Sequence, residues 1–201
     1  ERYFAIHAAQ WDAIRSLHVA ESQVEAAMAG ALSERPVGRL VDVGTGTGRM
    51  IEIFGHSAQS AIGIDRSPEM LRLARTKLAN TDTGPWELRQ GDLATLPVVD
   101  GGADTVILHQ VLHFIPAPEV ARILSPTGRL LIVDFAPHQR EELRNQGAHA
   151  RLGFSDEQMV GWFAAAGLDC DHAEELEGGT LTVKLWRGKR RAETHLKAVA
   201  A

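Results

Sequence analysis

Short apolar runs alternate with amphipathic segments along most of the chain. Five runs have the length and composition of buried strands: Leu40–Val43, Ala61–Ile64, Trp86–Arg89, Thr105–Leu108 and Leu130–Phe135. Between them, apolar residues at helical spacing predict helices over Arg49–Ser57, Pro68–Ala79 and Glu119–Leu124. Strands that alternate with helices form a parallel sheet with helices on both faces. The pattern therefore predicts a doubly wound α/β fold.

The C-terminal third changes this pattern. A helix is predicted from a cap at Ser155 to a stop at Gly167. The strand-like runs Leu168–Glu175 and Thr180–Arg187 follow, with a two-glycine turn between them. Because this turn is too short for a helical crossover, the two runs should pair as an antiparallel hairpin at the end of the sheet. We expect the basic residues from Arg187 onward to form a solvated end.

The region before Arg39 is expected to be helical. Apolar residues at mostly helical spacing from Tyr3 to Leu32 predict one or two amphipathic helices. We therefore expect an N-terminal helical lid over 1–38. A single domain over 39–201 should follow, with a mostly parallel, seven-stranded sheet.

The connection between the fourth and fifth strands is short. Only Pro116 to Pro126 is available for its helix, and three prolines fall within that stretch. A right-handed crossover between parallel strands normally needs a dozen or more residues. The crossover is therefore either abbreviated or incomplete in this sequence, and we expect residues to be missing near Ala117–Glu119.

Composition narrows the class of protein. The chain has 201 residues and a net charge of −5 at pH 7, which argues against a surface built to neutralise phosphates. It shows no membrane-spanning run or signal-peptide pattern, and its one cysteine, Cys170, excludes an internal disulfide framework. We expect a cytoplasmic protein that by itself binds neither nucleic acid nor membrane. Since the chain starts at Glu1, we also expect a segment to be missing upstream.

The stretch from Val41 to Gly48 carries the strongest chemical signal. An apolar strand that includes Asp42 runs into Gly44, Gly46 and Gly48, and a helix pattern follows. Glycines permit positive φ and let a ligand lie against the backbone, while the start of the helix offers free amides. Dinucleotide sites favour the spacing Gly-x-Gly-x-x-Gly. The spacing Asp-x-Gly-x-Gly-x-Gly, whose acid would repel a pyrophosphate, favours a ligand that bears an ammonium group.

Two further motifs follow the next two strands. Asp65 ends the second strand, where a carboxylate can accept both hydroxyl hydrogens of a ribose. Gln90-Gly91-Asp92-Leu93 follows the third strand and offers a carboxylate and a backbone amide to the edge of an adenine. Together the motifs describe a nucleoside that carries an amino-acid tail.

On these motifs, the segment from Arg39 to Phe135 resembles a Rossmann-like (class I) S-adenosylmethionine-dependent methyltransferase. The resemblance implies S-adenosyl-L-methionine as cofactor and methyl transfer to a small-molecule acceptor. By the same resemblance, Arg66 and Met70 would pack around the adenine, and His109 with Gln110 would lie beside the methionine tail. The implied cofactor site is Asp42, Gly44, Thr45, Gly46, Gly48, Asp65, Arg66, Met70, Gly91, Asp92, Leu93, His109 and Gln110.

A narrower resemblance gives an alternative function. Trp11-Asp12, Leu108–Phe114 and Ile132–His138 resemble the methyltransferase module of bacterial regulators in which an ArsR-type winged-helix DNA-binding domain stands in front of it. In such a regulator the pocket would sense S-adenosylmethionine or S-adenosylhomocysteine. DNA would then be bound through an N-terminal domain that this sequence lacks, and a homodimer is a further expectation.

Methyl transfer from a sulfonium needs a well-placed nucleophile and the exclusion of water, and it needs a base only when the acceptor loses a proton. Candidate bases lie after the fourth and fifth strands. We choose His113 first and His138 second, ahead of His109 and Asp134; the alternative is a histidine that only orients a loop. His109 and His113 share the spacing of the zinc motif His-Glu-x-x-His, but Gln110 replaces its glutamate, so we expect no metal.

Acceptor-binding residues are predicted from two segments. Tyr3 and Trp11 could reach the pocket from the lid, and His149 and Arg151 lie in the polar stretch before the last helix. An NAD(P)-linked oxidoreductase is disfavoured by the glycine spacing and by Asp42. An arsenic-methylating site is disfavoured because Cys170 is the only cysteine.

Overall fold

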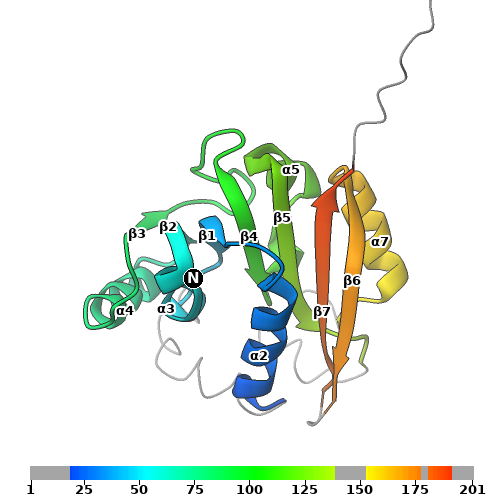
Figure 1. Ribbon diagram of the computed structural model, residues 1–201, viewed down its shortest axis with the longest axis horizontal. Helices are drawn as coiled ribbons and strands as arrows, with labels where there is room; N and C mark the ends of the chain where they lie inside the picture. Colours follow the sequence, from blue (N-terminus) through cyan, green and yellow to red (C-terminus); the bar gives the residue numbers. More distant parts are fainter. Residues whose placement is uncertain (1–18, 139–152, 178–180, 192–201) are drawn as a thin grey trace, which may run out of the picture.

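The computed structural model describes residues 19–138, 153–177 and 181–191. Its strands form one seven-stranded sheet in the order β3-β2-β1-β4-β5-β7-β6 (Figure 1). Strand β7 is antiparallel to both of its neighbours, and the other adjacent strands run parallel. This confirms the predicted sheet and its terminal hairpin. The strands are β1 (Gly38–Val43), β2 (Ala58–Asp65), β3 (Trp86–Gln90), β4 (Ala103–His109), β5 (Leu124–Phe135), β6 (Leu168–Leu176) and β7 (Val183–Arg190).

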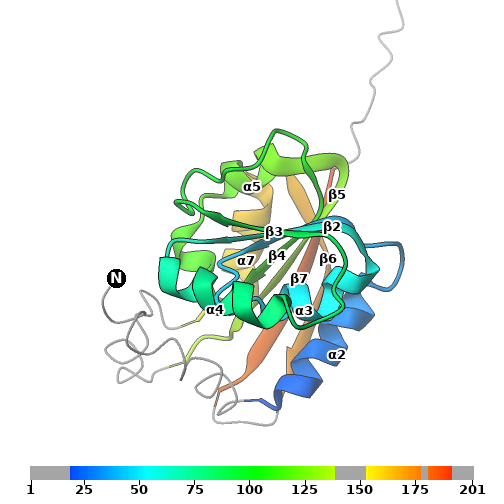
Figure 2. The same ribbon diagram turned by 90° about the vertical axis from the view of Figure 1, so that its left-hand side faces the viewer.

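Helices cover both faces of the sheet (Figures 1 and 2). On one face lie α2 (Glu21–Leu32), α3 (Arg49–Phe54) and α4 (Pro68–Leu78), and on the other lie α5 (Ala117–Ile123) and α7 (Asp156–Ala165). Each face has its own apolar core. Met28, Ile51 and Leu78 pack against one side of the sheet, and Val120 and Phe163 pack against the other.

Local sequence signals explain where the longer helices start. The Ser67 side chain accepts a hydrogen bond from the Met70 amide at the start of α4. Ser155 and Gln158 form a reciprocal capping box at the start of α7. The helix predicted over Arg49–Ser57 is divided instead, since α3 ends at Phe54 and a short 3-10 helix, η1 (Gly55–Ser57), follows.

The connection from β4 to β5 is short and contains one helix. After β4, the chain forms a 3-10 turn, η2 (Leu112–Phe114), and then the helix α5. Strand β5 begins at Leu124, earlier than the apolar run at Leu130 indicated, and it bulges between its pairings with Ala103 and Thr105. Ala117–Glu119 form the first turn of α5, and the expectation that residues are missing there stays a prediction.

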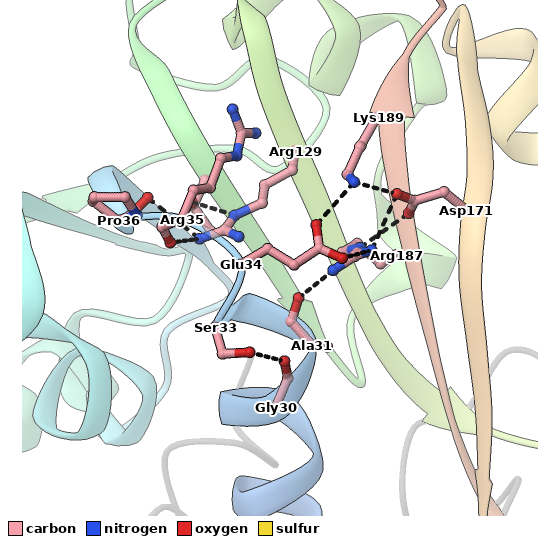
Figure 3. Close-up of polar contacts among 11 residues, drawn as sticks. Gly30, Ala31, Ser33, Glu34, Arg35, Pro36, Arg129, Asp171, Arg187 and Lys189 are labelled. Atoms are coloured by element: carbon pink, nitrogen blue, oxygen red, sulfur yellow. Dashed lines mark hydrogen bonds and ion pairs between the residues drawn. The ribbon is translucent and has the colours of Figure 1, made fainter.

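Residues around the end of α2 are joined to the sheet by a polar network (Figure 3). The Arg187 side chain on β7 is 5% exposed, and its Nη1 donates to the carbonyl oxygen of Ala31 at 2.6 Å. The same guanidinium pairs with Glu34 at 2.9 Å and with Asp171 at 3.0 Å, and Lys189 also contacts both carboxylates. The expectation of a solvated end from Arg187 is therefore wrong, because β7 extends to Arg190 and this face of it packs against the end of α2.

A second arginine in this region is fully buried. Arg129 has no exposed surface, and it donates to the carbonyl oxygens of Arg35 and Pro36 and to the hydroxyl of Thr105. Burial, together with the charges of Arg35 and Arg187, lowers its pKa to about 10. The partial negative charge of carbonyl groups just past the end of α2 compensates this cation.

The lid remains a prediction. Residues 1–18, with Tyr3 and Trp11, lie outside the described residues. The described part of segment 1–38 includes α2, which packs through Val24, Met28 and Leu32 onto the core of one sheet face.

Arg187→Ala should lower the free energy of unfolding by about 3 kcal/mol, because it leaves the Ala31 carbonyl without its donor and removes the buried one of the two cations beside Glu34 and Asp171. Urea denaturation followed by circular dichroism measures this change. Arg191→Ala is the matched control: its ion pair with Asp169 is exposed, and its loss should cost less than about 1 kcal/mol. Equal effects of the two substitutions would contradict the structural role of Arg187.

Candidate cofactor and acceptor site

The predicted cofactor residues meet at one edge of the sheet. Strands β1, β2, β3 and β4 run parallel, so the loops that follow Val43, Asp65, Gln90 and His109 all lie at their carboxyl ends. Open parallel sheets bind ligands at this edge, where the strand order reverses between β1 and β4. All thirteen predicted cofactor residues fall within the described part of the chain.

The loop after β1 is shaped by its own side chains and by its glycines. The hydroxyl of Thr45 donates to the Asp42 carboxylate at 2.6 Å, and both residues are buried. The amides of Gly44 and Thr45 donate to the carbonyl oxygen of Ile64 at 2.8 and 2.9 Å. Gly44, Gly46 and Gly48 all have positive φ, which other L-residues rarely adopt.

Asp65 connects two of the motifs. One carboxylate oxygen accepts the Gly46 amide at 2.9 Å, and the other accepts the Ser67 amide at 2.8 Å. Burial raises the pKa of this carboxyl group, and the surrounding amides offset part of the effect. Each oxygen of an ionised carboxylate keeps a second lone pair. Asp65 can therefore hold the glycine loop and still accept hydroxyl hydrogens from a ligand.

The third motif lies beside the first two. A Cβ atom at Gly91 would come within 2.8 Å of the Pro97 ring, so the backbone passes close to that residue. Asp92 is exposed and accepts the Ala94 amide at 3.0 Å, and Leu93 is buried. Of the two residues expected to pack around the adenine, Met70 is buried and Arg66 is exposed.

The loop after β4 contains a strained residue. Gln110 has φ = 58°, the one positive φ among the described residues other than glycine, and its amide donates to the carbonyl oxygen of Val133 at 2.8 Å. Such conformations are enriched at functional sites. His109 ends β4 and His113 lies in η2, so these histidines do not share a helix face as a zinc motif requires. The described residues hold no group of three metal-ligating side chains.

A small cavity lies next to this loop. It has a volume of ≈ 20 Å³, enough for about one water molecule, and it lies between α2, the end of β4 and the facing ends of β5 and β7. Sequence reasoning found only His109 and Gln110 among its residues, since the others come from segments far apart in the chain. The lining residues are Val19, Glu21, Val24, Glu25, His109, Gln110, Phe135 and Val183.

Ion pairs connect α2 to the glycine loop. Arg49, directly after Gly48, makes a two-pronged pair with Glu25 of α2 at 2.7 and 3.0 Å. It also pairs with Glu52 at 2.7 Å, and Glu52 contacts Lys77 of α4 at 3.0 Å. Hydrogen bonds to Glu25 raise the pKa of Arg49 above its usual value. The wall that α2 contributes to the cavity is thus anchored to the start of α3.

Neither of the two predicted catalytic histidines lines the cavity. The His113 ring packs 4.8 Å from the Phe154 ring and contacts Phe114, and its Nδ1 is buried. The His138 ring lies edge-on, 6.2 Å from the ring of Phe135, which is a cavity residue. The predicted acceptor-binding residues Tyr3, Trp11, His149 and Arg151 lie outside the described residues.

Asp134 is a buried acid at the carboxyl end of β5. It is 1% exposed, and its Oδ1 accepts the Phe135 amide at 2.9 Å. Its Oδ2 is buried without a hydrogen-bond partner among the described residues. Burial raises the pKa of Asp134 to about 7, and the amides of Phe135 and Leu112 offset part of that rise.

Two other findings concern membrane-spanning helices and the position of Cys170. Within the described residues, no helix is both long and apolar enough to span a bilayer. Cys170 is half-buried on β6, level with Leu130 across β7, so it lies near the opposite edge of the sheet from the ligand loops.

Residues 41–132 match the family model described as a methyltransferase domain. A phosphatidylethanolamine N-methyltransferase from Cereibacter sphaeroides is 34% identical over 132 residues, which cover 62% of this chain and 63% of that protein. A demethylmenaquinone methyltransferase from Tropheryma whipplei is 31% identical over 106 residues, which cover 50% of this chain and 43% of that protein. The chain thus spans less than two thirds of the length of these curated relatives.

Solved structures with low sequence identity share the fold. The YcgJ protein from Bacillus subtilis has a TM-score of 0.71 at 20% identity and covers 86% of this chain and 100% of its own. The N-methyltransferase NodS from Bradyrhizobium japonicum, crystallised with S-adenosyl-L-homocysteine, has a TM-score of 0.66 at 15% identity, with 86% and 88% coverage. The [4+2]-cyclase SpnF has a TM-score of 0.75 at 14% identity, with 95% and 94% coverage.

The buried carboxyl group of Asp134 should make stability depend on pH. Its folded pKa of about 7 exceeds the ordinary value of 3.8, so the folded state retains a proton that the unfolded state has lost. This group favours folding below about pH 4, and its contribution is lost as pH rises to about 7. Asp134→Asn should therefore raise the free energy of unfolding by about 2–4 kcal/mol at pH 8 and by much less at pH 4. Chemical denaturation at the two pH values measures the difference, and equal effects would contradict the buried charge.

Proposed function

We propose that this chain transfers a methyl group from S-adenosylmethionine to a small-molecule acceptor, from the premise that residues 41–132, which match a methyltransferase domain, belong to a class I S-adenosylmethionine-dependent methyltransferase. The observation that carries the proposal is the hydrogen bond between the Gly46 amide and the Asp65 carboxylate, which brings the first two cofactor motifs together. The residues fit the cofactor, because the glycine backbone is bare and Asp65 keeps lone pairs for ribose hydroxyls.

The chain's own residues have separate tasks in this proposal. Asp65 would hold the ribose, and the Gly91-Asp92-Leu93 turn would contact the adenine. The strained turn at His109 and Gln110 would contact the methionine tail. When bound, the cofactor supplies an electrophilic methyl group on a sulfonium. The protein then needs mainly to orient the acceptor and to exclude water.

We place the acceptor beside the cavity between α2 and the ends of β4, β5 and β7. Half of its lining, Val19, Val24, Phe135 and Val183, is apolar and lies next to the loop after β4. The relatives named above act, by their names, on a phospholipid amine and on a quinone precursor. A panel that contains both amines and quinols is therefore the appropriate first screen for the acceptor.

The sensing alternative is a proposal of another class. The resemblance of Leu108–Phe114 and Ile132–His138 to regulator modules supports it, together with the expected bacterial source, cytoplasmic location and homodimer. In that case the domain would bind S-adenosylmethionine without turnover, and DNA would be bound by a separate winged-helix domain. Sequencing the gene upstream of Glu1 tests this alternative directly.

Asp65→Ala should weaken the binding of S-adenosylhomocysteine by roughly 10- to 100-fold, because hydrogen bonds to a buried ribose are lost. Isothermal titration measures the change. Asp82→Ala, at an exposed aspartate on the connection between α4 and β3, is the matched control and should leave the affinity unchanged. Equal affinity of the Asp65 variant and wild type would remove the ribose role, and micromolar binding of NADH would reverse the choice of cofactor.

His113 is the first proposed base and His138 the second. His113→Gln should lower kcat by about 10²–10⁴-fold for an acceptor that must lose a proton, and it should leave the affinity for S-adenosylhomocysteine unchanged. A methyl-transfer assay together with isothermal titration separates the two effects. Unchanged turnover would reduce His113 to a packing partner of Phe154, and the same assay on His138→Gln would then decide whether His138 is the base.

A further inference from the structure

We propose that two copies of this chain pair through the outer edge of β3, so that their sheets join as one continuous sheet. β3 is the last strand at one end of the sheet, and within the described residues β2 is the one strand that pairs with it (Figures 1 and 2). The inference goes beyond the proposed function, because it assigns a surface to the expected homodimer and does not depend on the reaction. An edge strand presents unpaired backbone groups that another strand can bind.

The hydrogen bonds between β3 and β2 fix which backbone groups of β3 point outward. The carbonyl oxygen of Pro85 and the amide of Gly91 both bond to the β2 side, at 3.0 and 3.1 Å, and the register between the strands has no bulge. Because successive residues of a strand direct their backbone groups to alternate sides, the odd-numbered residues of β3 also bond to β2. The amides and carbonyl groups that point to the outer edge belong to Trp86, Leu88 and Gln90.

These three positions fit a second copy of the same strand in the antiparallel direction. With a two-fold axis at Leu88, this residue lies opposite its own equivalent, and Trp86 lies opposite Gln90 of the other copy. Each of these pairs can exchange two backbone hydrogen bonds. The register centred on Leu88 is the one that pairs all three outward positions.

The charges of β3 are complementary in the same register. Glu87 lies opposite Arg89 of the second copy, at the non-hydrogen-bonded positions where cross-strand side chains approach most closely. Within one copy these two side chains already pair at 2.8 Å, and they remain 58% and 31% exposed. A second copy would therefore complete a ring of alternating charges on this face of the strand, with no like charges opposite each other.

The other face of β3 gains apolar contacts. Trp86 and Leu88 pack against the core of one sheet face but stay partly exposed. In the paired state each Leu88 side chain would cover the other. A ladder of five residues is short, so we expect a weak dimer with a Kd of roughly 10–100 µM.

The opposite edge of the sheet lacks this complementarity. The register of β6 with β7 shifts between Cys170 and His172, and bulges of this kind keep an edge strand from pairing with another strand. β6 also holds four acids and no lysine or arginine, so a copy of itself would offer these acids no basic partner. The observations therefore favour β3 over β6 as the dimer edge.

Sedimentation velocity over about 1–300 µM, a range that spans the expected Kd, tests the wild-type chain, which should shift from monomer toward dimer. Glu87→Arg and Arg89→Glu each place like charges opposite each other, and each should raise the Kd roughly tenfold or more. The double variant restores opposite charges in exchanged positions, and its Kd should lie within about threefold of the wild-type value. An equal mixture of the two single variants should form a heterodimer, because one carries two bases on β3 and the other carries two acids.

Asp169→Arg is the matched control, because it reverses an exposed charge on the opposite edge strand and should leave the Kd unchanged. Thermal unfolding verifies that every variant is folded. Single variants that dimerise as strongly as wild type would overturn the inference, as would a double variant or a mixture that stays monomeric. A wild-type chain that is monomeric throughout the range would also overturn it and would leave this edge to a strand of another protein.

Discussion

The close contact between Gly44 and Val111 is the constraint on which the site depends. A Cβ atom at Gly44 would overlap the Val111 side chain, and the φ of +74° at this glycine excludes most other residues in any case. The loop after β1 and the loop after β4 are therefore in direct contact. Gln110, the residue before Val111, has a left-handed backbone. The hydrogen bond from its amide to the carbonyl oxygen of Val133 helps to hold this conformation. The shape of the cofactor edge thus depends on this backbone contact together with the hydrogen bonds of Asp42 and Asp65 to the glycine loop.

Helix α2 forms a wall of the cavity and is fixed both to the glycine loop and to the sheet. Near its first turns, Glu25 is held by Arg49 immediately after the glycine loop. At its far end, the Ala31 carbonyl is held by the buried Arg187 of β7. A helix fixed at both ends cannot shift without breaking one of these contacts. The positions of the cavity residues Val19 and Val24, at the beginning of this segment, are consequently set by contacts of the whole helix, one made by the cavity residue Glu25 and one made by Ala31 outside the cavity.

The sequence predicts those parts of the molecule whose signals are local. Short stretches of sequence predict the alternation of strands and helices, the glycine loop and the acid at Asp65. The sheet and the cofactor edge follow from these local signals. The cavity cannot be predicted from local sequence, because Val24, Phe135 and Val183 come together only through tertiary packing. The same holds for Arg187. Its charge predicts an exposed side chain, but it is buried because partners on α2 and β6 bind it.

Fold and reaction are separate questions for this architecture. SpnF has the same fold and is named a [4+2]-cyclase, so a high structural similarity alone does not specify methyl transfer. The distinction must come from the groups that surround the acceptor. Within the described residues, the cavity beside the loop after β4 is lined half by apolar and half by polar side chains, among them Glu21 and Glu25. Glu25 is neutralised by Arg49, whereas Glu21 forms no ion pair within the described ranges. Fold similarity therefore identifies the scaffold, and the lining of this cavity, rather than the sheet, is where acceptors would be distinguished.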